Sequence, residues 1–267
     1  MTSHNISDRK RDHLRLCAEE DVEAMVKTNL LDAVELFHDS LPELHVDQVD
    51  TSTLLFDREI EAPLLITGMT GGASEAARIN RQLATVASEF GLAMGVGSQR
   101  AMLDDPKLAE TYQLRRYAPN IPILANIGAV QAAESSTDMI GELCQSIDAD
   151  ALGIHLNPGQ ELIQPEGDRD FRGCVEAIAR LVDELDLPIV VKETGCGLSP
   201  SVLDRLRDIG VEWVDTSGAG GTTWIGVESR RAERDAADPQ RRGLCARGGP
   251  GGPAAHRVRG DLSAMRR

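Results

Sequence analysis

Short apolar runs alternate with longer amphipathic segments over most of the chain. The runs are too brief for helices, which predicts six buried strands at 62–67, 91–98, 121–128, 150–155, 187–193 and 211–217. The segments between them have apolar positions at helical spacing, which predicts helices at 74–90, 106–117, 136–146, 172–185 and 199–209. Strands that alternate with helices in this way are typical of an α/β fold with a parallel sheet.

Each predicted strand ends in small or polar residues, whereas the connections from helix to strand carry no such cluster. The polar strand ends are Thr67, Ser98, Asn126, His155, Lys192 and Ser217. In a parallel sheet the carboxyl ends of the strands point the same way, so these side chains would converge on one face. Each has a structural alternative, such as a core ion pair for Lys192. Six polar strand ends in succession nevertheless favour a ligand site.

The fourth run leads into the densest group of polar side chains. In residues 150–161, DALGIHLNPGQE, a short strand is followed by a turn at Pro158 and Gly159. An imidazole, two amides and a carboxylate follow the strand, from His155, Asn157, Gln160 and Glu161. A barrel enzyme carries its catalytic side chains at such a position. The alternative is a surface loop with a capping Asn.

A basic cluster lies near the N-terminus. Residues 8–16, DRKRDHLRL, contain Arg9, Lys10, Arg11 and His13 at the start of a predicted helix that runs towards residue 26. The cluster is either an anion clamp or a solvated helix end that complements neighbouring Asp side chains. Residues 29–60 contain several short segments, and the histidines among them, His38 and His45, lack the spacing of metal ligands. We expect these two histidines to be exposed.

The composition limits the location and partners of the protein. The net charge of the 267 residues is −15, and the first 228 carry −21, because residues 229–267 hold 10 Arg against 4 acidic residues. This acidity disfavours nucleic acid as a partner, and with few lysines it suggests a halophilic source. No apolar stretch resembles a membrane span or a signal peptide, so we expect a soluble cytoplasmic protein. The five cysteines form no C-x-x-C pair.

Six motifs in a fixed order carry a resemblance to a known family. They are RKRDHL, ITGMTGG, GSQR, HLNPGQE, VVKETG and DTSGAGGTTW. Residues 8 to 228 resemble type 2 isopentenyl-diphosphate isomerase, an FMN-dependent (β/α)8 TIM-barrel enzyme. The resemblance implies conversion of isopentenyl diphosphate to dimethylallyl diphosphate by reduced FMN as the acid-base agent, with Mg²⁺ and with NADPH as the priming reductant. It also implies tetramer-based homo-oligomers. A flavin-dependent oxidoreductase on the same barrel is the nearest enzymatic alternative.

The resemblance also implies roles for individual residues. His155 and Gln160 would be catalytic, and Glu161 would hold the Mg²⁺ that neutralises diphosphate oxygens. The residues expected to bind the substrate are Arg9, Lys10, Ser98, Gln99, Arg100, His155, Asn157 and Gln160. The residues expected to contact FMN are Thr67, Gly68, Met69, Thr70, Ser98, Asn126, Lys192, Ser217 and Thr222. The Lys192 ammonium near the flavin N1 and O2 edge would stabilise the anionic reduced ring.

The family pattern ends near residue 228. A complete barrel needs two further strands, and in the family the last two βα units bind the FMN phosphate. Residues 229–267 have no apolar periodicity and are rich in Arg, Gly and Pro, which predicts a disordered tail. We therefore expect an N-terminal segment at 1–61, a partial barrel of about six βα units at 62–228 and a tail at 229–267. The tail is either sequence translated out of frame or a genuine basic extension. The chain is either a working isomerase or an inactive remnant.

Overall fold

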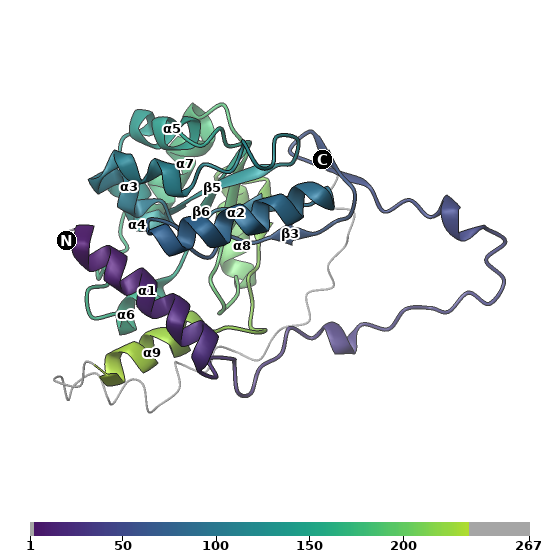
Figure 1. Ribbon diagram of the computed structural model, residues 1–267, viewed down its shortest axis with the longest axis horizontal. Helices are drawn as coiled ribbons and strands as arrows, with labels where there is room; N and C mark the ends of the chain where they lie inside the picture. Colours follow the sequence, from purple (N-terminus) through teal and green to yellow (C-terminus); the bar gives the residue numbers. More distant parts are fainter. Residues whose placement is uncertain (1–2, 235–267) are drawn as a thin grey trace.

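A parallel sheet forms the centre of the molecule (Figure 1). The computed structural model describes residues 3–234. In spatial and sequence order the strands are β3 (Leu65–Ile66), β4 (Ala93–Gly95), β5 (Ile123–Gly128), β6 (Ala151–His155), β7 (Ile189–Lys192) and β8 (Trp213–Asp215). Each strand pairs in parallel with the next, so the six predicted strands and the α/β class are confirmed. Within residues 3–234, β3 and β8 are the open edges of this sheet.

Helices follow the strands. They are α2 (Ser74–Glu89), α3 (Arg100–Asp104), α4 (Ala129–Glu134), α5 (Thr137–Gln145), α6 (Pro158–Ile163), α7 (Cys174–Glu184) and α8 (Pro200–Asp208). Four of the five predicted helices are confirmed, and α8 begins as its sequence indicates: the Ser199 hydroxyl accepts from the Val202 N–H, and Pro200 is the first helical residue. The short helices α3, α4 and α6 were not predicted.

The helix predicted at 106–117 is wrong. The chain there forms only a 3₁₀ helix, η3 (Pro106–Thr111), whose first turn is capped by the Asp105 side chain. Beyond it Tyr112 and Leu114 are both fully buried, at 0% and 1% exposure. Residues two apart lie on different sides of a helix, so one amphipathic helix could not bury both against the same core. The chain turns inward instead, which brings the Tyr112 ring beneath the sheet's polar end.

The core lies between the sheet and its helices. All six residues of β5 are buried, as expected for a central parallel strand that is covered on both faces. Its largest side chains, Ile123 and Ile127, share one hydrophobic cluster with Ile154 of β6, Ile140 of α5 and Leu181 of α7. This cluster holds the strand ends in a fixed register, which matters because the polar side chains follow directly after them.

Two helices distant in sequence lie side by side at one end of the sheet. They are α1 (Ser3–Glu19) and α9 (Trp224–Arg234), which are adjacent in Figure 1 and share a small cluster of Leu16, Val22 and Val227. The predicted N-terminal helix is therefore confirmed but ends near residue 19. Helix α9 crosses the boundary expected at residue 228 and continues to Arg234. The rest of the predicted tail, residues 235–267, lies outside the described residues.

A long exposed segment connects α1 to the sheet. Residues 25–50 are all exposed and form a wide arc (Figure 1), with two short 3₁₀ turns, η1 (Leu31–Ala33) and η2 (Val46–Gln48). The hairpin of β1 (Thr53–Leu55) and β2 (Arg58–Ile60) follows. His38 and His45 are exposed on the arc, as expected. No helix among the described residues is long and apolar enough to cross a membrane.

Candidate functional site

The six strand ends open into one pocket of about 360 Å³. Its lining includes, among the predicted site residues, Arg9, Lys10, Thr67, Gly68, Met69, Thr70, Ser98, Arg100, Asn126, His155, Asn157, Gln160, Glu161, Lys192, Ser217 and Thr222. The parallel register explains this convergence, since Gly128, His155 and Lys192 are neighbours in the ladder and Lys192 pairs with Asp215. Residues from all six βα units thus reach a common cavity, together with α1.

Gln99 is the one predicted site residue that does not line the pocket. Its side chain is fully buried, where Oε1 accepts from the Asn126 backbone N–H at 2.9 Å and Nε2 donates to the Leu143 carbonyl at 3.4 Å. The family resemblance implies a substrate-binding role for Gln99, but the turn after β4 directs its side chain into the core. The expectation that Gln99 binds substrate does not fit this placement, and its role is to tie β4 to β5.

His155 is held as a neutral imidazole at the base of the pocket. Its Nδ1 lies 2.9 Å from Asn126 Oδ1, and the Asn126 amide in turn donates to the Val96 carbonyl at 2.9 Å. Burial, and then the charges of Lys192, Lys10 and Arg100, lower the pKa of His155 to about 3. Since the Asn126 oxygen accepts the Nδ1 proton, Nε2 carries the lone pair. The site therefore offers a neutral hydrogen-bond acceptor here.

Lys10 reaches the pocket from α1 through a buried hydrogen-bonded site. The Lys10 ammonium donates to the Ser98 carbonyl at 3.0 Å and to the Tyr112 hydroxyl at 3.3 Å, and it lies 5.6 Å from the Tyr112 ring centroid. Burial, followed by the charge of Arg9, lowers the pKa of Lys10 to about 7. Burial likewise raises the pKa of Tyr112. An anion in the pocket would restore the favourable environment of a charged Lys10.

Arg9, also on α1, is the least satisfied cation of the site. Its Nε is buried without a hydrogen-bond partner, and its nearest carboxylate, Glu166, is 3.9 Å away. Burial lowers the pKa of Arg9 in spite of Glu166. Buried polar groups without partners are rare in folded proteins, and a buried guanidinium with an unused N–H is a natural site for a phosphate oxygen. The donor set on α1 therefore fits a bound anion.

The carboxylate of Glu161 is buried and faces the pocket from α6. Its Oε1 accepts from Asn157 Nδ2 and its Oε2 accepts from the Asp168 N–H, both at 2.8 Å. Within residues 3–234 there is no group of three or more His, Cys, Asp and Glu side chains that could enclose a metal. A single carboxylate is still compatible with Mg²⁺, which is commonly bound by one or two carboxylates, ligand phosphates and water.

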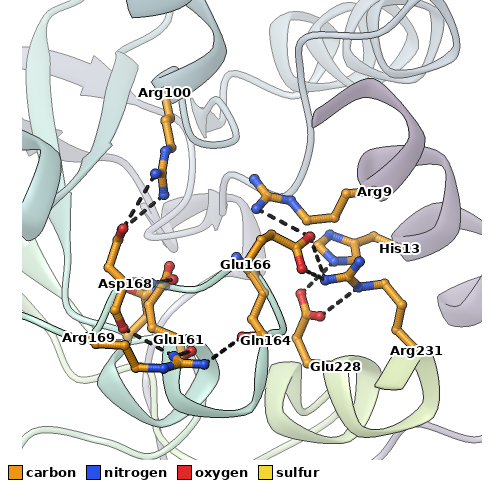
Figure 2. A network of polar contacts seen from close by, with 11 residues as sticks. Arg9, His13, Arg100, Glu161, Gln164, Glu166, Asp168, Arg169, Glu228 and Arg231 are labelled. Carbon is orange, nitrogen blue, oxygen red and sulfur yellow. Dashed lines mark hydrogen bonds and ion pairs between the residues drawn. The ribbon is translucent and has the colours of Figure 1, made fainter. Parts of the chain in front are cut away.

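A polar network beside the pocket joins α1, α9 and the loop after α6 (Figure 2). Arg231 donates to both oxygens of Glu166 at 2.6 Å and to Glu228 at 2.8 Å, and His13 Nε2 lies 2.8 Å from Glu228. Burial opposes ionisation of Glu228, but His13 and Arg231 together outweigh it and lower the Glu228 pKa. The Gln164 amide, oriented to satisfy its neighbours, donates to Glu228 and accepts from Arg9. This network closes the pocket beside the basic cluster.

Several pocket residues were missed by the sequence analysis. The lining also includes His13, Gln131, Gln164, Glu193, Asp215 and Trp224. His13 belongs to the basic cluster, and Glu193, Asp215 and Trp224 belong to the motifs VVKETG and DTSGAGGTTW, but none of the six was assigned a role. A weak signal existed for α9, because Trp224 and Val227 recur at helical spacing and Glu228 precedes Arg231 by three residues, a spacing typical of a helical ion pair.

The pocket fits the ring of a flavin better than a flavin phosphate. Asn126, Lys192 and Ser217 bring an amide, an ammonium and a hydroxyl to one side, and Gly218 has open space where a side chain would stand. Of the residues that the structure describes, the Arg and Lys side chains lining the pocket are Arg9, Lys10, Arg100 and Lys192. Three of these four belong to the substrate clamp expected from the sequence. A flavin phosphate would therefore have no separate cation here.

Comparison with known proteins places this pocket in context. An isopentenyl-diphosphate delta-isomerase of Cronobacter sakazakii is 47% identical over 238 residues, which cover 88% of this chain and 68% of the relative. The isopentenyl-diphosphate delta-isomerase of Nostoc sp. PCC 7120 is 43% identical over 232 residues, which cover 86% of this chain and 66% of the relative. For that of Ignicoccus hospitalis the identity is 46%, over 85% of this chain and 63% of the relative. The chain thus spans about two thirds of these relatives.

Two further comparisons add little. No family model matches the chain. Among solved structures, a mandelate oxidase variant with a C4a-OH-FMN adduct is 12% identical, with a TM-score of 0.48 over 84% of this chain and 72% of that chain. A similarity of this degree supports no inference about function.

Proposed function

Because this chain belongs to the isopentenyl-diphosphate delta-isomerase family, we propose that its pocket binds isopentenyl diphosphate and converts it to dimethylallyl diphosphate. The observation that carries the proposal is that the pocket combines cationic side chains, which can bind an anion, with a neutral imidazole, beside which an apolar group can lie. On α1, the buried Nε of Arg9 has no hydrogen-bond partner and the pKa of Lys10 is lowered to about 7. His155 in the same pocket is a neutral imidazole. A diphosphate bears its charge at one end and a short apolar chain at the other, which matches this division.

The residues of the chain have distinct tasks in this proposal. Arg9, Lys10 and Arg100 bind the diphosphate, and Glu161 would hold Mg²⁺, whose charge would neutralise diphosphate oxygens. His155 and Gln160, which both line the pocket, would orient the hydrocarbon end. Asn126 fixes the tautomer and orientation of that imidazole at 2.9 Å. Residues of the helices α1 and α9, among them His13 and Trp224, line the same space.

FMN is the cofactor that we propose for the site, with NADPH as its reductant. When bound and reduced, FMN supplies the acid-base chemistry that moves a proton on carbon. On the protein side Thr67, Gly68, Met69, Thr70, Ser98, Asn126, Lys192, Ser217 and Thr222 would contact it. The Lys192 ammonium, whose Nζ donates to the Glu193 carbonyl at 3.0 Å, would stabilise negative charge on the ring. A cytoplasmic location and a tetramer-based homo-oligomer stay predictions.

The test begins with cofactor retention. The purified 267-residue chain is loaded with FMN in high salt and passed through gel filtration, and bound flavin is read from its visible absorbance. Isopentenyl diphosphate, Mg²⁺ and NADPH are then added, and the two isomers are separated and quantified. Isomerisation without net NADPH consumption supports the proposal, and consumption in proportion to product would favour the oxidoreductase. Retained FMN without either reaction, or no retained flavin, would favour the inactive remnant.

A further inference from the structure

Two carboxylates in the loop after α6 each face one arginine of the expected clamp (Figure 2). We call residues 164–169 the carboxylate loop. Asp168 pairs with Arg100, with contacts of 2.9 Å from Nη1 and 3.5 Å from Nη2. Glu166 lies 3.9 Å from Arg9 and is engaged mainly by Arg231. The Asp168 pair is therefore the close, two-pronged one, and the geometry of Arg100 depends on it.

Asp168 is itself held by contacts that do not involve Arg100. Its Oδ2 accepts from Gln131 Nε2 at 2.7 Å, and its backbone N–H donates to Glu161 Oε2 at 2.8 Å. Arg169 ties the loop further by donating to the backbone carbonyls of Glu161 and Gln164. The Asp168 carboxylate would keep its place if Arg100 moved away. Asp168 therefore contacts Arg100 from a position that other residues hold in place.

We propose that Asp168 is a positioning residue that sets the Arg100 guanidinium for a diphosphate and links it to the metal carboxylate Glu161. A long Arg side chain loses considerable rotamer freedom on binding, and a carboxylate that fixes it beforehand reduces that loss. The fork to Asp168 leaves the Nε and the remaining N–H groups of Arg100 for an anion. The inference rests on the proposed function of the same pocket.

A competing role for Asp168 would have the opposite sign. If its charge merely occupied Arg100, its removal would release a cation and tighten anion binding. The side chains of Arg100 and Asp168 are only 22% and 20% exposed, so solvent screens their charges weakly and screening does not separate the two roles. The rigid support of Asp168 by Gln131 and the Glu161 carboxylate favours positioning over competition.

A double-mutant cycle with pyrophosphate separates these roles. Binding of pyrophosphate with Mg²⁺ is measured by calorimetry for the full chain, for Asp168→Asn, for Arg100→Ala and for the double variant. We expect Asp168→Asn to weaken binding roughly tenfold, equivalent to about 1.4 kcal/mol. In the Arg100→Ala background the same change should have almost no effect, because Asp168 acts through Arg100. Asp170→Asn is the matched control, since Asp170 lies on the next stretch of chain and pairs with an exposed Arg172.

Each result bears on the proposal. Unchanged or tighter binding by Asp168→Asn overturns positioning while leaving the diphosphate site in place, and so does an equal loss in both backgrounds. Absence of pyrophosphate binding by the unmodified chain overturns the anion site itself and with it this inference. If Asp168→Asn does not fold, as judged by circular dichroism, Gln131→Met replaces it in the cycle. That variant removes the 2.7 Å support of Asp168 and also changes a side chain that lines the pocket. A loss that is present with Arg100 and absent in the Arg100→Ala background is therefore the result that supports positioning.

Discussion

Arg231 should stabilise the folded protein far more than an arginine in an ordinary surface ion pair. Its side chain is 10% exposed and makes three charge-assisted hydrogen bonds, two to Glu166 at 2.6 Å and one to Glu228 at 2.8 Å. Glu228 is fully buried, so replacing Arg231 by Met leaves a carboxylate with only His13 and Gln164 as partners. The methionine keeps most of the side-chain volume, which isolates the loss of charge.

The magnitude follows from burial. Removing one partner of a buried ion pair costs about 3–5 kcal/mol, and because Glu166 is 16% exposed we expect the low end, about 3 kcal/mol. For a domain of this size each kcal/mol lowers the melting temperature by about 2–4 °C, so Arg231→Met should melt roughly 6–12 °C below the unmodified chain.

The control is an arginine in the same kind of helical spacing but on the surface. Arg207 pairs with Asp204 at 2.9 Å, with side chains 72% and 60% exposed, and Arg207→Met should cost at most about 1 kcal/mol. Both variants are unfolded with urea and monitored by circular dichroism. Equal free energies of unfolding for the two variants would refute the docking of α9 against α1 and the carboxylate loop. It would also return residues 229–234 to the predicted tail.

Two further predictions concern binding and packing. Since the pKa of Lys10 is lowered to about 7 from 10.5, its charge is lost as pH rises through 7, and pyrophosphate affinity measured by calorimetry should fall more steeply with pH in the unmodified chain than in Lys10→Met. In the unfolded chain Lys10 keeps its proton up to about pH 10.5, so its contribution to the stability of the fold rises between pH 7 and 10.5. Unfolding through Lys10 therefore cannot explain a loss of pyrophosphate affinity in that range. Parallel pH profiles for the unmodified chain and Lys10→Met would contradict the lowered pKa of Lys10. Gly68→Ala would place a Cβ 1.9 Å from the Val96 carbonyl, whereas Gly218→Ala meets nothing within 4 Å. Gly68→Ala should lower the free energy of unfolding, measured with urea, by several kcal/mol, and Gly218→Ala should leave it nearly unchanged. Similar free energies of unfolding for the two variants would contradict the close approach of Gly68 to the Val96 carbonyl.

Much of the fold was predictable from local pattern. The runs at 121–125 and 151–154 contain no polar side chain, a composition typical of a short strand buried on both faces. Once the strands were parallel, the direction of their ends followed, so the convergence of Asn126, His155 and Lys192 needed no structure. The one failed helix, at 106–117, contained the necessary warning, because Tyr112 and Leu114 cannot share a helical face.

Side-chain direction at the site was harder to predict. Ser98, Gln99 and Arg100 are consecutive and polar, and sequence alone treats them alike. In the structure Ser98 and Arg100 line the pocket, while Gln99 bonds the Asn126 backbone inside the core. The turn after β4 decides this, since one residue of rotation moves a side chain from one side of the chain to the other.

The strand order, the polar end of the sheet and the identity of most pocket residues could be predicted from the sequence, because hydrophobic period and chain direction are local properties. The tertiary structure alone decided which carboxylates meet which arginines. Arg231 and Glu166 are 65 positions apart, His13 and Glu228 are 215 apart, and Arg100 and Asp168 are 68 apart. No local pattern encodes such pairs, since each exists only after α1, α9 and the carboxylate loop pack around one cavity. The pairing of charged side chains at the site therefore depends on the fold, whereas the residues that the site contains could be predicted largely from the sequence.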